Sequence, residues 1–287
     1  MSAPRILVVG CGYLGLEVAR LFHLEGWEVI GCTRSGELAE GAERVEFTIR
    51  ACDVSEREEV KRLADLENLD AVVHCASSSR GGADQYRRVY LEGAQNLAEV
   101  LTPKLLLFTS STSVYAQTDG EWVSEESSAK PDRETGCILR ETEELVCAGG
   151  GTAIRVAGIY GPARSVLLKK FFSGEAVIEG DGARWINQAH RDDVATAIWR
   201  LVTHRAHGIF NVADNTPISQ RELYARLAER FERPLPPRGS IDPHRKRGWT
   251  HKRVSNAKLR SLGWKPVYPS FFDALENDPR LLAGFAV

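Results

Sequence analysis

The N-terminal part of the chain joins an apolar run, Ile-Leu-Val-Val, to three spaced glycines. Gly10, Gly12 and Gly15 have the spacing GxGxxG, and the residues after them repeat apolar positions with a helical period. In a strand-turn-helix unit of this kind, the first glycine makes the tight turn, the second admits a pyrophosphate close to the backbone, and the third lets the helix pack on the strand. The phosphates then lie at the N-terminus of the helix, where the dipole favours an anion. This segment, with Tyr13 and Leu14 inside it, predicts a dinucleotide site; the alternative is a glycine turn with a structural role only.

The length and charge of the chain restrict its partners. With 287 residues it can form one large α/β domain, or a nucleotide-binding domain with a smaller one. The net charge of -2 gives no general attraction to nucleic acid or to a membrane surface. No apolar stretch reaches the length of a membrane span, and the N-terminus lacks a signal-peptide pattern. We therefore expect a soluble, cytoplasmic protein with a small-molecule substrate, no nucleic-acid partner and no membrane partner.

The cysteines do not have the spacing of a metal site. No CxxC pair occurs, and no histidine stands beside a cysteine at ligand spacing, so we expect reduced thiols and no metal. Cys137 stands out only because it falls near the expected active site. The six are Cys11, Cys32, Cys52, Cys75, Cys137 and Cys147.

Strands and helices alternate through residues 1–161, which predicts an α/β protein with a doubly wound parallel sheet, the Rossmann fold. Both faces of such a sheet are covered by helices, so its strands read as continuous apolar runs. After the first strand, strands are expected at residues 28–32, 70–75, 104–109 and 152–156, and helices at 56–66, 85–100 and 140–146.

The pattern is less regular beyond residue 161. Residues 162–287 are expected to form a smaller substrate-binding domain, with a segment at about 186–203 returning to pack on the Rossmann domain, because residues 192–202 have one apolar helical face. Ser219, with Glu222 three residues later, forms a capping-box pattern that predicts another helix. The proline-rich stretch 234–243 predicts a loop.

The end of the second expected strand favours NADP over NAD. An acidic residue often stands there to bind the ribose hydroxyls, but this chain has Thr33, Arg34 and Ser35 instead. A guanidinium flanked by hydroxyls suits a 2′-phosphate, because arginine offers fork-shaped, charge-assisted hydrogen bonds. The alternative is a solvated arginine in a loop.

Further cofactor contacts are expected at the ends of the other strands. Asp53 and Val54 come after the strand that follows residues 28–32, where the carboxylate can bind the adenine amino group. Cys75, Ala76 and Ser77 lie at the end of the strand expected at 70–75. Small and polar residues in this order support a ligand along the carboxyl edge of the sheet. The remaining candidates on this edge are Thr109, Arg140 and Val156.

Four passages together identify a family. They are GCGYLG at residues 10–15, TSSTSVY at 109–115, RVAGIYGP at 155–162 and INQAHRDD at 186–193. With them the chain resembles the extended short-chain dehydrogenase/reductases, and more narrowly the NAD-dependent epimerase/dehydratase group that acts on nucleotide sugars. The resemblance covers almost the whole length. It implies a nicotinamide cofactor, a nucleotide sugar as substrate and, as in many members, a homodimer, formed here through helices near 85–100 and 138–148.

The resemblance breaks at the catalytic residues. The family's Ser or Thr that binds the substrate hydroxyl maps onto Ser111, but its catalytic tyrosine maps onto Gly136 and its lysine onto Arg140. Glycine has no proton to exchange, and arginine keeps its charge but is no base at ordinary pH. No Tyr-x-x-x-Lys occurs anywhere in the sequence. The chain is thus placed with the atypical members that keep the cofactor motif and lose the tyrosine.

No other residue replaces that tyrosine convincingly. Ionisable side chains occur near the motifs, but two tyrosines are expected to pack at strand ends and the histidine to anchor the returning segment. These candidates are Tyr115, Tyr160, Glu134, Cys137 and His190.

Basic residues near the C-terminus are candidates for the substrate. Residues 244–253 form a dense basic cluster around a tryptophan, which suits a diphosphate and base; a solvated basic loop is the alternative, and the overall charge argues against nucleic acid. The candidate substrate residues are Ser111, Tyr115, Arg184, Arg238, Lys252 and Arg253.

Two functions follow from these patterns. The first is an NAD(P)-dependent oxidoreductase or epimerase-like enzyme on a nucleotide sugar or related hydroxyl compound, with Ser111 and Arg140 in modified roles. The second is an NADP-binding regulator or sensor that has lost its chemistry. The glycine-rich turn supports both equally, whereas Gly136 favours the second and the substrate region favours the first.

Overall fold

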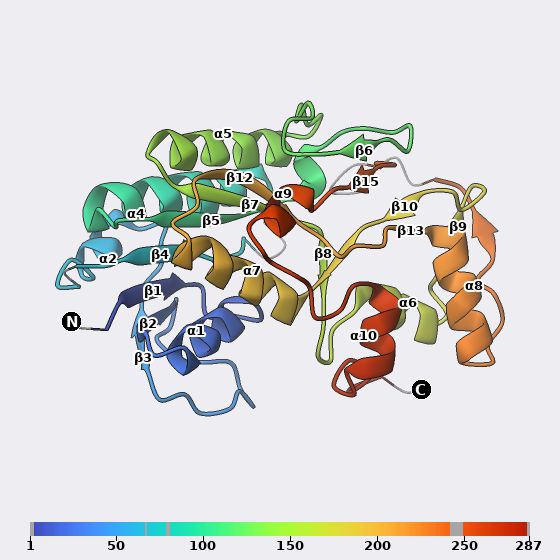
Figure 1. Cartoon of the computed structure of the whole chain (residues 1–287), viewed down its shortest axis with the longest axis horizontal. Helices are drawn as coiled ribbons and strands as arrows, with labels where there is room; N and C mark the ends of the chain where they lie inside the picture. The colour runs from blue at the N-terminus through green and yellow to red at the C-terminus, as the bar shows by residue number, and fades with distance from the viewer. Residues whose placement is uncertain (1–2, 67, 79–80, 242–248, 286–287) are drawn as a thin grey trace.

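A central sheet of seven parallel strands organises the computed structural model, which describes residues 3–66, 68–78, 81–241 and 249–285 (Figure 1). The strand order is β12-β7-β5-β4-β1-β2-β3, so the chain runs outward from β1 in both directions. This confirms the predicted doubly wound α/β sheet. The strands are β1 (Arg5–Val9), β2 (Glu28–Thr33), β3 (Thr48–Ala51), β4 (Ala71–His74), β5 (Leu106–Ser111), β7 (Thr152–Val156) and β12 (Gly208–Val212).

Helices cover both faces of this sheet. On one face α1 (Gly15–Leu24) packs against α7 (Arg191–Thr203), and on the other α4 (Gly93–Leu101) lies between α2 (Arg57–Lys61) and α5 (Glu134–Ala148). Because β1 is covered from both sides, Ile6, Leu7 and Val8 are fully buried. No helix within the described ranges has the length and apolar character needed to span a membrane.

The helix expected at 85–100 has a π turn in its middle. It runs through α3 (Ala83–Tyr86), the π-helix η1 (Arg87–Glu92) and α4. Inside the π turn the carbonyl of Val89 accepts a hydrogen bond from Nε2 of His74, 2.9 Å away at the end of β4. Burial lowers the pKa of His74 to about 4, so the ring is neutral and the contact ties this helix to the sheet.

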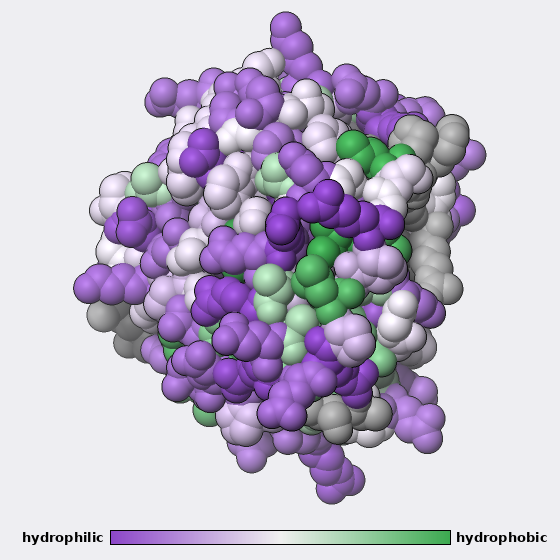
Figure 2. All heavy atoms as spheres, turned by 90° about the vertical axis from the view of Figure 1, so that its right-hand side faces the viewer, coloured by the Kyte–Doolittle hydropathy of each residue, from purple (hydrophilic) through white to green (hydrophobic). Residues whose placement is uncertain are grey.

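A second, smaller core lies at the C-terminal side of the molecule. Its centre is aromatic, with Tyr160, Phe171, Tyr224 and Phe271 buried together. The helices around it are α6 (Val166–Phe172), α8 (Gln220–Arg230) and α10 (Phe271–Asn277), and the face they form is mostly polar with one apolar strip (Figure 2). Ser219 caps α8 by accepting from the backbone N–H of Glu222, as its sequence pattern predicts.

Short strand pairs connect the two cores. The pairs are β8 (Gly158–Tyr160) with β11 (Gln188–His190), β10 (Trp185–Ile186) with β13 (Ile218–Ser219), β14 (Arg238–Gly239) with β9 (Ile178–Glu179), and β15 (Arg253–Val254) with β6 (Trp122–Val123). The proline-rich stretch therefore contains a strand, β14, where only a loop was expected; its residues 242–243 lie outside the described part.

The part of the chain that joins the large core is longer than residues 186–203. After α7, β12 adds the outermost strand of the main sheet beside β7. Residues Val254, Leu259 and Trp264 then pack into the same core, with Leu259 on α9 (Ala257–Ser261). The C-terminal half thus alternates between the two cores.

Candidate cofactor and substrate site

The glycine-rich turn between β1 and α1 is anchored to the neighbouring strands. The backbone N–H groups of Gly10 and Cys11 both donate to the carbonyl of Cys32 at the end of β2, at 2.9 and 2.8 Å. Gly10 has a φ of +91°, and a Cβ on it would overlap the backbone of Ala76. A Cβ on Gly15 would overlap the carbonyl oxygen of Gly10. Both glycines are therefore required by the fold itself.

Gly12 differs from these two glycines. A Cβ built on it meets no atom within 4 Å, so the protein leaves open space beside this backbone. Open space at the middle glycine, at the start of a helix, fits the pyrophosphate of a dinucleotide. Leu14 is buried under the turn, and the ring of Tyr13 lies below the guanidinium of Arg164, 4.6 Å from its centroid.

The loop after β2 holds Arg34 away from other side chains. Thr33 Oγ1 donates to the carbonyl of Glu37 at 2.9 Å, and Ser35 Oγ accepts from the N–H of Glu37 at 3.3 Å, so both hydroxyls shape the loop. Arg34 is exposed and has no ion pair or hydrogen bond among the residues that the structure describes. Its guanidinium is therefore available to a ligand at the end of β2.

The other expected cofactor residues lie at the same sheet edge with different exposure. Asp53 is used locally, because its Oδ1 accepts from both the N–H and the hydroxyl of Ser55. Cys75 Sγ lies 3.4 Å from Thr109 Oγ1, which joins the ends of β4 and β5. Of the rest, Val54 and Val156 are buried, Ala76 borders Gly10 and Ser77 is exposed.

All six cysteines are free thiols, as expected. Burial raises the pKa of Cys11 and Cys75, the two beside the glycine-rich turn, to about 12 and about 11. These thiols stay protonated and unreactive, and they serve as small apolar residues.

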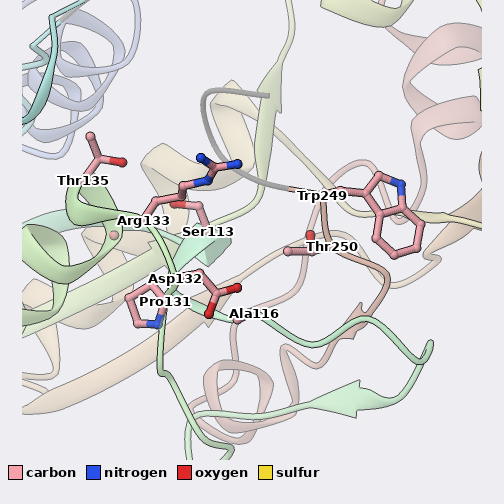
Figure 3. A pocket seen from close by; sticks show the side chains of 9 residues that line it. Ser113, Ala116, Pro131, Asp132, Arg133, Thr135, Trp249 and Thr250 are labelled. Atoms are coloured by element: carbon pink, nitrogen blue, oxygen red, sulfur yellow. The ribbon is translucent and has the colours of Figure 1, made fainter. Parts of the chain in front are cut away.

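A pocket of about 200 Å³ lies at the N-terminus of α5 (Figure 3). Hydroxyl groups of Ser113 and Thr250 stand on opposite sides of it, and Trp249 lies beside Thr250 in the segment that leads to β15. We call it the α5 pocket. Its lining residues are Ser113, Ala116, Pro131, Asp132, Arg133, Thr135, Gly136, Trp249 and Thr250.

Gly136 lies in the wall of the α5 pocket with little space beside it. A Cβ on this residue would lie 2.5 Å from Cβ of Pro131, which is closer than side chains pack. The proline ring therefore occupies the space that a side chain at position 136 would need. A tyrosine here requires Pro131 to move.

Arg140 is bound along its own helix. Its guanidinium donates to Glu143 at 2.7 Å and to Glu144 at 2.9 Å. Glu143 is fully buried and also accepts from Arg155 at 2.8 Å and from the hydroxyl of Ser110 at 2.6 Å. In this structure Arg140 is thus the outermost member of a buried ion-pair network.

Tyr115 belongs to the same interior network. It is fully buried, its hydroxyl accepts from Arg155 at 2.8 Å, and it lies 2.9 Å from Oδ1 of Asn211 and 2.8 Å from the carbonyl of Ser124. The side chain therefore ends inside the protein and not in the α5 pocket. Sequence reasoning missed Glu143 and Asn211; the spacing of Glu143 three residues after Arg140 is a weak signal, whereas Asn211 has none.

Ser111 contributes to the pocket through its neighbour. Its Oγ accepts from the N–H of Ser113 at 3.2 Å and so caps the short 3-10 helix η2 (Thr112–Val114). This contact presents Ser113 to the pocket. The run of hydroxyl residues at 109–113 indicates that one of them lines the site, but the sequence alone does not distinguish Ser113 from Ser111.

The basic candidates for the substrate are spread over two places. Lys252 is 5% exposed and donates to the carbonyl of Tyr115 at 2.8 Å and to Oγ1 of Thr250 at 2.9 Å. Arg253 lies between the rings of Trp122 and Trp185, 5.1 Å from each centroid. Arg238 is exposed on β14. Residues 244–248 of the basic cluster lie outside the described part of the chain.

Arg184 lies close enough to Lys252 to affect its charge. Burial, with the positive charge of Arg184 as a second cause, lowers the pKa of Lys252 to about 7. Arg184 is itself largely buried just before β10, with its Nε 3.4 Å from Glu179. The structure thus brings two of the predicted substrate residues close together, and one of them, Lys252, contacts Thr250 of the α5 pocket.

The remaining ionisable candidates lie elsewhere. Tyr160 is fully buried in the smaller core, where burial raises the pKa of its hydroxyl. His190 is buried against Asp278 at 3.1 Å. Atoms of His190, Asp192 and Asp278 approach within 4.8 Å, but Arg280 donates to both carboxylates at 2.7 Å and already balances their charge. Cys137 and Glu134 are exposed at the start of α5.

The parallel sheet and the glycine-rich turn at its carboxyl edge define a Rossmann-type α/β protein. The chain belongs to the NAD-dependent epimerase/dehydratase family, whose model matches residues 6–213.

Two curated relatives are similar over almost their whole length. Protein YeeZ of Escherichia coli (strain K12) is 28% identical over 280 residues, covering 92% of this chain and 96% of YeeZ. A 3-diazoavenalumate denitrifying reductase from Streptomyces sp is 26% identical over 309 residues, covering 96% of this chain and 100% of the relative.

Solved structures show the same fold. A protein from Methylobacillus flagellatus, described as an NAD-dependent epimerase/dehydratase, is 29% identical with a TM-score of 0.80 and covers 98% of both chains. The UDP-glucose 4-epimerase of Thermus thermophilus, solved in complex with NAD, is 20% identical with a TM-score of 0.79, covering 96% of this chain and 97% of the epimerase. The second likeness concerns the fold alone.

Proposed function

We propose that this protein is an NADP-dependent oxidoreductase that acts on a nucleotide sugar or a related hydroxyl compound. The observation that carries the proposal is the α5 pocket, which is lined by hydroxyl residues and opens at the same sheet edge as the glycine-rich turn. In doubly wound folds a ligand binds outside the carboxyl ends of the strands. A bound nicotinamide would supply or accept the hydride there.

Arg34 supports NADP rather than NAD. The loop at the end of β2 carries no acidic residue at residues 33–35, and Arg34 has no partner among the described residues, so it suits a 2′-phosphate. In this proposal the pyrophosphate lies against Gly12, and the adenosine lies between Arg34 and Asp53. The other proposed cofactor residues are Gly10, Tyr13, Leu14, Gly15, Thr33, Ser35, Val54, Cys75, Ala76, Ser77, Thr109 and Val156.

Titration with NADPH and NADH tests the cofactor. Replacing Arg34 with alanine removes charge-assisted hydrogen bonds worth about 1.5–3 kcal/mol, so the Kd for NADPH should rise by about tenfold or more. The Kd for NADH should not change. Arg44→Ala is the matched control, because Arg44 is an exposed arginine of the same connection between β2 and β3. A preference for NADH, or an unchanged Kd in Arg34→Ala, refutes the assignment.

The size of the α5 pocket limits how a nucleotide sugar can bind. Its 200 Å³ is below the range of about 300–1,000 Å³ that is usual for whole ligands, so it accommodates only the reacting end of such a substrate. We propose that Arg184 and Arg253 contact the part of the substrate that lies outside the pocket. Ser111 and Arg140 act indirectly here, the first by holding Ser113 and the second through Glu143.

Turnover is tested with a panel of UDP- and dTDP-linked sugars. The protein loaded with NADP(H) should change the nicotinamide absorbance or interconvert epimers with at least one member of the panel. Unchanged absorbance and unchanged sugars throughout the panel contradict the proposed enzyme activity. The expected homodimer and cytoplasmic location stay predictions.

One observation favours a second function, an NADP-binding regulator or sensor. Gly136 provides no acid or base, and Pro131 fills the space beside it. A protein that binds NADPH tightly but converts no member of the sugar panel would support this alternative.

A further inference from the structure

Lys252 is a buried amine whose partners are all neutral. Its Nζ donates to the carbonyl of Tyr115 and to the hydroxyl of Thr250, and no carboxylate within the described ranges forms an ion pair with it. An ammonium has three N–H groups, so these two bonds leave one N–H without a partner among the residues that the structure describes. Buried lysines are normally paired with a negative charge. A structural ion pair therefore does not explain this lysine.

The groups around Lys252 leave it close to the balance between a charged ammonium and a neutral amine. Arg184 approaches from the segment before β10 and disfavours a second positive charge, while Glu179 lies 3.4 Å from Nε of Arg184. On the strand of Lys252 itself, His251 accepts from the N–H of Trp185 through Nδ1, and the guanidinium of Arg253 lies between two tryptophans. The segment after β5 offers only the backbone carbonyl of Tyr115. With its pKa near 7, the amine is charged in part of the molecules and neutral in the rest at neutral pH.

Thr250 connects this amine to the α5 pocket. Its Oγ1 lies 2.9 Å from Nζ of Lys252, and the residue lines the pocket across from Ser113 and Pro131 (Figure 3). A threonine hydroxyl donates one hydrogen bond and accepts others, so a proton can enter from one side as another leaves from the other. The amine is too deeply buried to line the pocket itself, and the hydroxyl bridges that gap.

We propose that Thr250 and Lys252 form a proton relay that serves the α5 pocket in place of the missing tyrosine. This inference rests on the proposed oxidoreductase function.

The relay balances the reduction of a carbonyl compound. The substrate carbon gains a hydride from the reduced nicotinamide, which is left oxidised, and the π bond of the carbonyl breaks. The oxygen takes the hydroxyl proton of Thr250 while the hydroxyl takes a proton from the Lys252 ammonium, which becomes a neutral amine. Solvent reprotonates the amine after the product leaves. Oxidation of the alcohol runs through the same steps in reverse.

A competing role for Lys252 is to bind a phosphate of the substrate together with Arg184. The two roles affect different quantities. A phosphate contact contributes to substrate affinity, so its loss raises KM, whereas a proton relay contributes to the transition state, so its loss lowers kcat. The pH profile separates them further, because only the relay needs the amine to exchange its proton.

The test compares kcat and KM for NADPH-dependent reduction of a UDP-linked keto sugar across neutral pH. Thr250→Val and Lys252→Met should each lower kcat by about 100-fold or more, the usual size of general acid–base catalysis. Thr250→Ser should keep most of the activity because the hydroxyl remains. Wild-type kcat should fall as the pH rises through the pKa of Lys252, and Lys252→Arg should lack that fall because arginine does not titrate there.

Lys258→Met is the matched control. Lys258 also donates to a backbone carbonyl, that of Ile209 at 2.8 Å, but it is exposed on α9 and does not line the pocket. This variant should behave as the wild type. The Kd for NADPH should be the same in all of these variants.

A measurement without turnover follows the lysine directly. In protein labelled with carbon-13 lysine, the signal absent from Lys252→Met should titrate near neutral pH, and Thr250→Val should shift its midpoint.

Two sets of results overturn the relay. One is an active wild type with full kcat in Thr250→Val. The other is Lys252 variants in which KM rises while kcat and the pH profile stay unchanged, which assigns the lysine to a phosphate. A wild-type protein that binds NADPH but reduces no keto sugar refutes the proposed function itself, which is a different result from an active wild type with an active Thr250→Val.

Discussion

The glycine-rich turn and the α5 pocket lie at the same edge of one sheet, yet they are built differently. At the turn, Gly12 faces open space and Arg34 has no partner among the described residues. At the α5 pocket, Pro131 fills the space beside Gly136, and one turn further along α5 Arg140 is bound to two glutamates. The first region has the residue types of a dinucleotide site, whereas in the second the positions of the family's tyrosine and lysine are occupied by residues that contact other parts of the protein. Cofactor binding and chemistry can therefore be inferred separately in this chain.

The contacts along α5 also explain what Arg140 does without a tyrosine beside it. In typical members of the family this position is a lysine that binds ribose. Here the guanidinium of Arg140 donates to Glu143, and Glu143 also accepts from Arg155. Two arginines share one fully buried carboxylate. The network stabilises the contact of α5 with β5 and β7, and the proton relay that we propose uses another side of the pocket.

The largest expected effect tests whether this network is structural. Glu143→Gln removes the carboxylate that Arg155 needs in the interior, and breaking such a buried pair costs about 3–5 kcal/mol of unfolding free energy. Glu144→Gln is the matched control, since Glu144 also binds Arg140 but is mostly exposed, and it should change stability by less than about 1 kcal/mol. Urea unfolding measures both. Equal losses in the two variants would contradict a structural role confined to the buried partner.

A smaller effect tests the buried amine of the α5 pocket. The folded-state pKa of Lys252 is about 7 and lies below its ordinary value of 10.5, so the unfolded chain binds more protons between these values. Stability should therefore rise with pH above about pH 7, by about 1 kcal/mol per pH unit from this residue. Lys252→Met should lack that rise, whereas Lys258→Met should keep it. Urea midpoints between about pH 7 and pH 9 measure it; an unchanged slope in Lys252→Met would show that the amine is not desolvated.

The sheet and the glycine-rich turn could be predicted because their information is local. An apolar run followed by GxGxxG specifies a strand, a turn and a helix within a few residues. The same holds for α8, where Ser219 and Glu222 form the cap within one turn. The sequence defines the ends of elements less closely than their cores. The helix α5 begins at Glu134 and not at the expected residue 140, because its apolar period starts only after Gly136.

The α5 pocket could not be predicted because it joins residues far apart in the sequence. Thr250 faces Ser113 only after β15 pairs with β6, and Asn211 reaches Tyr115 only after β12 joins the main sheet. A two-residue strand such as β15 has no periodicity long enough to be recognised. The basic side chains were visible in the sequence, but the burial that separates Lys252 from an ordinary surface lysine was not.

The most direct test of the difference between the two regions measures NADPH affinity and stability together in Gly12→Val and Gly136→Ala. Gly12→Val should bind NADPH at least about tenfold more weakly, while its unfolding free energy stays close to that of the wild type because a Cβ at this position has no protein atom within 4 Å. Gly136→Ala should lose about 1–3 kcal/mol of stability against Pro131 and keep the wild-type Kd. If Gly12→Val binds NADPH normally, or if each variant loses both affinity and stability, then the glycine-rich turn and the α5 pocket do not differ in this way.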